Sequence, residues 1–222
     1  MVERFFSTRQ MEDRSHSHSH PIMLLSGPPS SGKTSLLFQY AYNSATQTSF
    51  SHQNVLFICN RRNLESNPPF LSQHIQMKYV EDDEGIKRYF AAFHLHNTLP
   101  STIIIDDFGD FFDERSCQER YGNSRGRELA MVRTLALCHN AIIHANETRP
   151  CKLLLSDTHR GDSLRLLFIY KRWVSTIFTI KGDGSGSFIL KSNSSSESKR
   201  TAKYTIALHY LCLEGITEDC EQ

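Results

Sequence analysis

The sequence has no apolar run near the about 18 to 20 residues that are needed to cross a lipid bilayer. Residues 1–20 lack both the apolar stretch of a secretion signal and the basic amphipathic pattern of a transit peptide. A large excess of one charge is also missing, because 25 lysines and arginines face 24 aspartates and glutamates, for a formal net charge of +1. We therefore expect a soluble intracellular protein without membrane contact, and we exclude a carrier that binds nucleic acid through its overall charge.

The six cysteines are too scattered to predict a zinc site or a disulfide framework. No C-x-x-C pair occurs, and nothing indicates secretion, so free thiols are the expectation. His16, His18 and His20 alternate with serines in a segment too polar to pack, a pattern that can also bind metal loosely. We interpret residues 1–20 as a disordered polar leader.

Four short apolar runs divide the first part of the chain, at residues 22–25, 55–59, 102–105 and 152–155. They lack polar alternation, which predicts strands of a parallel sheet that is buried on both faces. Segments with the helical spacing of apolar residues lie between these runs. The alternation predicts an α/β fold with right-handed crossovers and helices on both faces of the sheet.

After about residue 174 the apolar residues begin to alternate with polar ones. Residues 174–180 and 187–191 are predicted strands on either side of a glycine-rich turn, and residues 204–212 are predicted to form one long strand after a serine-rich loop. We therefore expect a C-terminal antiparallel β extension of the parallel core.

The predicted organisation is thus one domain with two short terminal segments. The α/β domain is expected to span residues 21–215, between the leader at 1–20 and an acidic tail at 216–222.

The clearest motif is Gly-Pro-Pro-Ser-Ser-Gly-Lys-Thr at residues 27–34, which matches the P-loop pattern G-x-x-x-x-G-K-[ST] between a predicted strand and a predicted helix. In a P-loop, converging backbone N–H groups and the positive end of a helix dipole face the negative charges of a polyphosphate. Lys33 is expected to reach the β- and γ-phosphates, and the Thr34 hydroxyl to bind Mg²⁺. The predicted nucleotide-binding residues are Gly27, Pro28, Pro29, Ser30, Ser31, Gly32, Lys33, Thr34 and Ser35.

A candidate metal-binding carboxylate follows the isoleucine run at residues 103–105. Because an aspartate is costly to bury unless it is paired or binds metal, Asp106 is assigned to Mg²⁺, directly or through water. Asp107 is expected to point the other way along an extended backbone, where it either orients a water or caps a turn. The carboxyl ends of the four predicted strands should meet at one edge of the sheet, the usual ligand crevice of α/β folds.

Residues 22–35, 55–66 and 102–112 resemble the SWIM-domain-protein-associated ATPase, the small recombinase-paralogue subunit of Shu-type complexes. The most distinctive piece is the strand that ends in Arg61 and Arg62, since the P-loop and the Mg²⁺ motif are shared by the wider RecA class. The resemblance implies a RecA-like P-loop fold, binding of ATP with Mg²⁺, and weak DNA-stimulated hydrolysis. It also implies a nuclear protein that promotes recombinase assembly in homologous recombination repair. The implied partners are a SWIM-type zinc-finger protein, a RecA-type recombinase and single-stranded DNA.

The resemblance fails at the catalytic base. RecA-type enzymes generally carry a glutamate just after the second strand, where this sequence has Arg61, and Glu65 lies a few residues further on. Loss of a positioned base costs a factor of about 10² to 10⁴ in rate, so slow turnover is expected. The predicted catalytic residues are Lys33 and, as alternative bases, Asp107 and Glu65.

RecA-like proteins generally hold single-stranded DNA with the loops that follow the third and fourth core strands. The cations after the third predicted strand are Arg115, Arg120, Arg125, Arg127 and Arg133. Those after the fourth, which are the predicted DNA contacts, are Arg160, Arg165, Lys171 and Arg172. The aromatic rings available for base stacking are Tyr121, Tyr170 and Trp173. Ordinary solvated charges are the alternative interpretation of these cations.

Two other functions stay open. One is a small-molecule P-loop kinase that uses Arg125 and Arg127 as a mobile phosphate lid, and the other is a nucleotide-binding scaffold without turnover. The strand order separates the first from a RecA-like protein. One strand inserted between the Gly27 strand and the Asp106 strand favours the RecA class, whereas direct adjacency favours the kinase.

Overall fold

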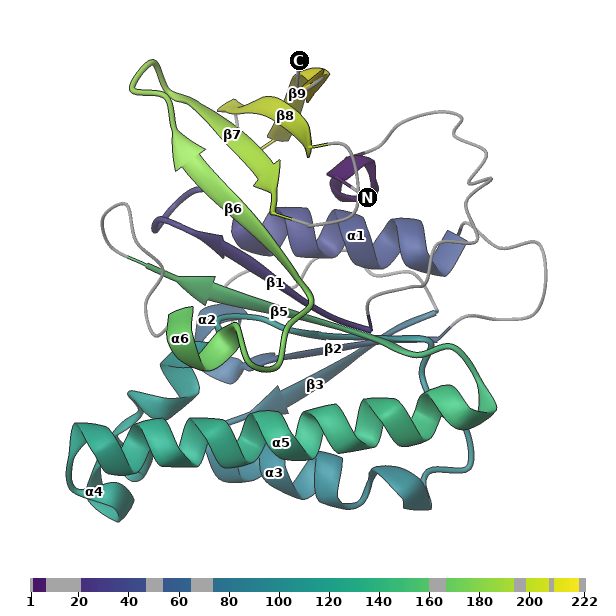
Figure 1. The fold of residues 1–222 in the computed structure, drawn as a ribbon, viewed down its shortest axis with the longest axis vertical. Coiled ribbons are helices and arrows are strands. Elements are labelled where there is room, and N and C mark those ends of the chain that lie inside the picture. The colour runs from purple at the N-terminus through teal and green to yellow at the C-terminus, as the bar shows by residue number, and fades with distance from the viewer. Residues whose placement is uncertain are drawn as a thin grey trace.

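The computed structural model describes residues 2–6, 21–46, 54–64, 74–159, 167–193, 199–207 and 210–219. Within these residues the strands form one sheet in the order β3-β2-β4-β5-β1-β6-β7-β8-β9 (Figure 1). The strands are β1 (Ile22–Gly27), β2 (Val55–Asn60), β3 (Ile75–Val80), β4 (Thr102–Ile105), β5 (Lys152–Thr158), β6 (Thr176–Gly182), β7 (Ser187–Ser192), β8 (Lys199–Ala207) and β9 (Tyr210–Asp219).

Helices connect most of the parallel strands. The α-helices are α1 (Lys33–Thr46), α2 (Arg61–Leu64), α3 (Asp83–Ala91), α4 (Arg115–Tyr121), α5 (Ser124–Thr148) and α6 (Leu167–Tyr170). Three short 3-10 helices are η1 (Val2–Phe5), η2 (Phe93–Leu95) and η3 (Phe108–Phe112).

The sheet has a parallel part and an antiparallel part. Strands β3, β2, β4, β5, β1 and β6 pair in parallel, and β7, β8 and β9 continue from β6 as antiparallel neighbours. The predicted α/β class with a mostly parallel sheet and a C-terminal antiparallel β region is confirmed. All four apolar runs of the sequence form parallel strands.

The two faces of the sheet explain why these runs show no polar alternation. Ile22 and Leu24 of β1 pack with α3 and α5 on one face, whereas Met23 and Leu25 pack with α1 on the other (Figure 1). A strand covered on both faces must be apolar at every position.

Two parallel strands differ from the sequence-based prediction: β6, expected in the antiparallel extension, pairs in parallel with β1, and β3 is not predicted at all. β3 lies at the edge of the sheet and pairs with β2 alone, and its Gln76 and Tyr79 are exposed. Because an edge strand is less buried than a central one, β3 does not carry a continuous apolar run.

The predicted single strand at residues 204–212 is wrong, because the chain forms two paired strands there, β8 and β9. The period-two pattern of residues 204–212 in the sequence runs from β8 into β9, so it does not show where one strand ends and the next begins. β9 also continues to Asp219, and residues 216–219 therefore belong to the sheet and not to an acidic tail. Residues 220–222, and the serine-rich segment at 194–198, lie outside the described residues.

The prediction of a disordered leader is wrong for the first few residues. Val2, Phe5 and Phe6 are buried, and the Phe5 ring lies 5.1 Å from Tyr40 of α1 and 5.0 Å from Phe178 of β6. Burial of these three apolar side chains stabilises the packing of the segment against the core, although the sequence that follows it is polar. Residues 7–20, which include His16, His18 and His20, lie outside the described residues.

Two further predictions concern the whole chain. Within the described part, none of the helices combines the length and the apolar character that a membrane span requires. The five cysteines described there, Cys59, Cys117, Cys138, Cys151 and Cys212, are free thiols, and only Cys212 is exposed.

Candidate phosphate-binding site

The loop between β1 and α1 has a left-handed backbone at two positions, one of them a glycine. Ser30 and Gly32 have φ angles of 58° and 74°, in the left-handed region that favours glycine. A Cβ atom on Gly27 would lie 2.9 Å from both Ile180 Cβ and Ser31 Oγ, so the chain requires glycine there. The motif residues 27–34 therefore form a compact loop that ends at the first turn of α1, as the sequence predicts.

Polar groups of this loop are directed toward its own interior. The Ser31 hydroxyl donates to the carbonyl oxygen of Pro28 over 2.8 Å, and the Lys33 ammonium donates to the same oxygen over 3.0 Å. Only 6% of Lys33 is exposed, although it carries a full charge. An ammonium group has three N–H donors, and among the described residues one of them has a partner. The remaining donors suit an anion held in the loop.

Thr34 and Asp106 meet across the sheet. The Thr34 hydroxyl donates to Asp106 Oδ2 over 2.8 Å, although 72 residues separate the two positions. The Ser156 hydroxyl of β5 donates to Asp106 Oδ1 over 2.7 Å, and Asp106 is 3% exposed. The carboxylate thus lies beside the threonine with which it is predicted to bind Mg²⁺.

The pKa of the Asp106 carboxyl is raised to about 6, chiefly by burial and also by the charge of the adjacent Asp107. Hydrogen bonds from Ser156 and Thr34 and the charge of Lys33 act in the opposite direction. Among the described residues, no lysine or arginine forms an ion pair with Asp106. The carboxylate is therefore held by neutral hydroxyls, and a hard cation such as Mg²⁺, which prefers oxygen ligands, fits this donor set.

Asp107 differs from the prediction, because its backbone is not extended. Its φ and ψ angles of 48° and 55° are left-handed, and its N–H donates to Ser156 Oγ over 2.8 Å. The Thr158 hydroxyl donates to Asp107 Oδ1 over 2.5 Å. Asp107 precedes η3, but its side chain makes no capping hydrogen bond, so the turn-capping alternative lacks support. Two hydroxyls of β5 instead hold the Asp106–Asp107 pair at the edge of the sheet.

From the sequence, residues 156–160 are expected at this edge near the nucleotide, but no role as partners of the two aspartates is predicted for Ser156 and Thr158. Ser156 and Thr158 are two positions apart, so they lie on the same face of a strand that pairs with β4. Their place at the end of an apolar run is a signal that could have identified them. At the same end of β5, His159 Nδ1 and Ser26 Oγ form a buried hydrogen bond of 2.8 Å.

The structure describes only some of the predicted catalytic and DNA-binding residues. Glu65, Arg160 and Arg165 lie outside the described residues. Lys171 and Arg172 are exposed in the turn after α6, as a DNA contact requires.

The predicted stacking rings are only partly available. Tyr170 is fully buried, so it cannot stack on a base, and Trp173 is partly buried. Phe168, for which the sequence predicts no role, is 68% exposed one helical turn before Lys171 and Arg172.

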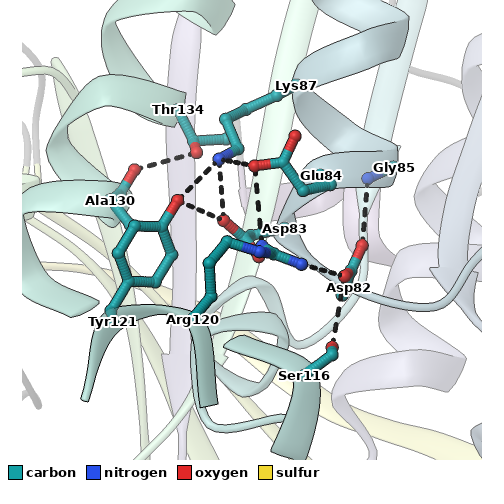
Figure 2. Close-up of polar contacts among 10 residues, drawn as sticks. All are labelled: Asp82, Asp83, Glu84, Gly85, Lys87, Ser116, Arg120, Tyr121, Ala130 and Thr134. Atoms are coloured by element: carbon teal, nitrogen blue, oxygen red, sulfur yellow. Dashed lines mark hydrogen bonds and ion pairs between the residues drawn. The ribbon is translucent and has the colours of Figure 1, made fainter. Parts of the chain in front are cut away.

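Arg120 and Tyr121 belong to a charged network between α3 and α4, as Figure 2 shows. Arg120 bonds Asp83 Oδ1 over 2.7 Å and Asp82 Oδ2 over 2.8 Å, and Lys87 lies 2.9 Å from Asp83 Oδ2. This network satisfies Arg120 within the protein, which favours the alternative interpretation of Arg120 as an ordinary surface charge.

The other arginines after β4 are less constrained. Arg115 pairs with Glu119 on the surface of α4, and Arg127 lies 4.0 Å from Asp113. Arg125 and Arg127 are part of the 25-residue helix α5.

The fold and the site together define an α/β protein in which a glycine-containing loop and a buried carboxylate meet at the carboxyl edge of a parallel sheet. No protein-family model and no curated protein matches this sequence.

Proposed function

We propose that this chain is an ATP-binding, slowly hydrolysing RecA-like subunit that promotes recombinase assembly on single-stranded DNA in homologous recombination repair. The observation that carries the proposal is the 2.8 Å contact between Thr34 and Asp106 in a sheet where β5 separates β1 from β4. The inserted strand is the order expected of the RecA class, and direct adjacency of β1 and β4 is the order expected of the kinase. The antiparallel strands beyond β6 support the same choice.

Each part of the loop has a role in this proposal. The backbone N–H groups of residues 30–34 and the positive end of α1 hold the polyphosphate of ATP, whereas Pro28 and Pro29 have no N–H to donate. Lys33 adds a positive charge, and Thr34 with Asp106 holds Mg²⁺. Bound Mg²⁺ would neutralise phosphate charge and relieve the cost of burying the Asp106 carboxylate.

Slow hydrolysis follows from the groups near the phosphate end. Arg61 follows β2, where the RecA class carries its glutamate, so this position provides no base. Asp107 is the described carboxylate closest in sequence to Asp106, and one of its oxygens already accepts a hydrogen bond from Thr158. A nucleotide-binding scaffold without turnover is therefore the second candidate.

The small-molecule kinase is less well supported. The strand order is not the one expected of a kinase. The predicted lid would also require Arg125 and Arg127 to lie on a segment that can close over a substrate. Both residues lie within α5, whose buried residues pack against the sheet.

The DNA contacts and the partners are further proposals. Lys171 and Arg172 would hold the phosphate backbone together with Arg160 and Arg165, and the exposed Phe168 would stack on a base. A SWIM-type zinc-finger protein, a RecA-type recombinase and a nuclear location follow from the sequence resemblance.

Nucleotide binding is tested by calorimetry with Mg²⁺ and ATP. Lys33→Ala should weaken binding at least about tenfold, because one charge-assisted hydrogen bond contributes about 1.5–3 kcal/mol. The matched control is Lys181→Ala, which removes an exposed lysine of β6. Equal affinities of Lys33→Ala and the wild type, or no binding by the wild type, would contradict the proposal.

DNA binding is tested separately, with fluorescent single-stranded DNA at two salt concentrations. Arg172→Ala should weaken binding more at low salt, because it removes a phosphate contact, and Phe168→Ala should weaken binding about equally at both. A wild type that binds ATP but no single-stranded DNA, alone or with ATP, would overturn this part of the proposal. Turnover of many ATP molecules per second without DNA would overturn the slow-hydrolysis part.

A further inference from the structure

Tyr204 of β8 connects the antiparallel part of the sheet with the loop at residues 27–34. Its hydroxyl donates to the backbone carbonyl oxygen of Ser31 over 2.7 Å, and its side chain is fully buried. The two residues are 173 positions apart in the sequence. Strand β8 therefore takes part directly in the candidate phosphate site.

The bond from Tyr204 constrains a peptide group whose N–H belongs to Gly32. The described part of the chain contains no cis peptide bonds. In a planar trans peptide the C=O and N–H bonds point in opposite directions. A donor that holds the Ser31 carbonyl from the side of β8 therefore directs the Gly32 N–H away from β8. N–H groups of this loop are the donors that would bind a polyphosphate.

The backbone around Ser31 requires support from its surroundings. Ser30 and Gly32, on either side of it, both have positive φ angles. A non-glycine residue in this conformation costs about 1–2 kcal/mol, and it persists where neighbouring contacts enforce it. Ser31 has such contacts on both sides, because its hydroxyl donates to the Pro28 carbonyl and its carbonyl accepts from Tyr204.

Tyr204 is itself held in place by aromatic neighbours. The rings of Phe6 and Phe188 each lie 5.6 Å from the Tyr204 ring. Arg200, four residues earlier on β8, pairs with Glu3 of η1 over 2.7 Å. The N-terminal segment and β7 thus fix the position from which the tyrosine hydroxyl reaches Ser31.

We propose that Tyr204 is a positioning residue for this loop, whose hydroxyl orients the peptide group between Ser31 and Gly32 so that the Gly32 N–H is ready to bind phosphate. The inference rests on the proposed nucleotide binding. Tyr204 acts through the backbone and does not touch the ligand.

The test compares Tyr204→Phe with Tyr40→Phe. Each removes one hydroxyl from a buried tyrosine of the same apolar cluster, and Tyr40 lies on α1 outside the loop. Affinities for ATP and for inorganic tripolyphosphate are measured with Mg²⁺. Tyr204→Phe should weaken both ligands by the same factor, about three- to tenfold, the net effect of one hydrogen bond. Tyr40→Phe should leave both affinities within about twofold of the wild type.

A second readout separates positioning from a general loss of stability. Amide hydrogen exchange of residues 27–35 without ligand should be faster in Tyr204→Phe than in the wild type, while exchange in α5 stays the same. Phe6→Leu, which removes a ring beside Tyr204 and keeps its hydroxyl, should weaken both ligands in the same direction by about twofold.

The outcomes distinguish this inference from the proposed function. If the wild type binds both ligands and Tyr204→Phe binds them equally well, the positioning role is wrong and the proposed function stands. If Tyr204→Phe does not fold, unchanged affinity of Phe6→Leu overturns the role. If the wild type binds neither ligand, the proposed function fails first.

Discussion

Two polar clusters lie at the same carboxyl edge of the sheet and differ in how their carboxylates are satisfied. In the network between α3 and α4, the acids Asp82, Asp83 and Glu84 contact the cations Lys87 and Arg120 (Figure 2). At the candidate phosphate site, Asp106 and Asp107 are held by the hydroxyls of Thr34, Ser156 and Thr158.

The pKa directions follow this difference. Burial opposes ionisation of Asp82, but hydrogen bonds from Arg120, the Gly85 N–H and Ser116 outweigh it and lower its pKa. Burial dominates at Asp106 and raises its pKa to about 6. A carboxylate paired with cations stabilises the fold, whereas one held by neutral hydroxyls keeps a negative charge that a cation can use. The first cluster is structural by this criterion, and the second has the unpaired negative charge that the proposed Mg²⁺ site requires.

The largest expected effect is loss of stability on removal of the central acid of the network. Asp83 has no exposed side-chain surface and contacts both Arg120 and Lys87. Asp83→Ala removes the buried partner of both cations, while Asp82 and Glu84 still contact them, so it should lower the free energy of unfolding by about 1.5–3 kcal/mol, measured by urea denaturation. The matched control is Glu119→Ala, which removes the partner of the 91% exposed Arg115 on α4 and should cost at most about 1 kcal/mol. Equal losses of unfolding free energy in the two variants would show that the buried network stabilises the fold no more than a surface ion pair does.

Asp106→Asn should have the opposite effect on stability. The substitution removes a buried charge whose raised pKa shows that the folded state disfavours it, so in metal-free buffer at pH 7.5 the variant should be more stable by about 1 kcal/mol. Its Mg²⁺-dependent affinity for ATP should fall at least about tenfold. Urea denaturation and calorimetry measure the two quantities. A clear loss of stability in Asp106→Asn would show that the Asp106 carboxylate stabilises the fold, as the paired carboxylates do, and would contradict the difference between the two clusters.

The smallest expected effect is a pH dependence in the network. Because the folded state lowers the pKa of Asp82 below its ordinary value of 3.8, this carboxylate stabilises the fold above that pH and loses the contribution as the pH falls through the folded-state pKa. The difference in unfolding free energy between the wild type and Asp82→Asn should therefore be constant from pH 5 to 7 and shrink below about pH 4. Urea denaturation across this range measures it. A difference that grew on acidification would mean that the Asp82 pairs do not hold in solution.

The two clusters also differ in how far the sequence predicts them. The loop motif and Asp106 are visible because each follows a continuous apolar run, and local patterns of this kind identify buried parallel strands. The network of Figure 2 is not visible, because Asp82 and Arg120 are 38 residues apart and meet only when α4 packs beside α3. The candidacy of Arg120 as a DNA contact rests on its position in the sequence, which does not reveal these partners. Phe168 and Tyr170 show the same limit, since two residues of one short helix differ completely in exposure.

The sequence alone determined the four central strands, the glycine loop and the aspartate beyond the isoleucines, because burial on both faces and the need for glycine act on each residue locally. The tertiary structure decided that β5 separates β1 from β4, that Ser156 and Thr158 hold the two aspartates, and that Tyr204 reaches the loop. It also decided that residues 2–6 pack into the core and that β8 and β9 are separate strands. These features depend on contacts between segments far apart in the chain, and a local periodicity carries no information about which segments meet.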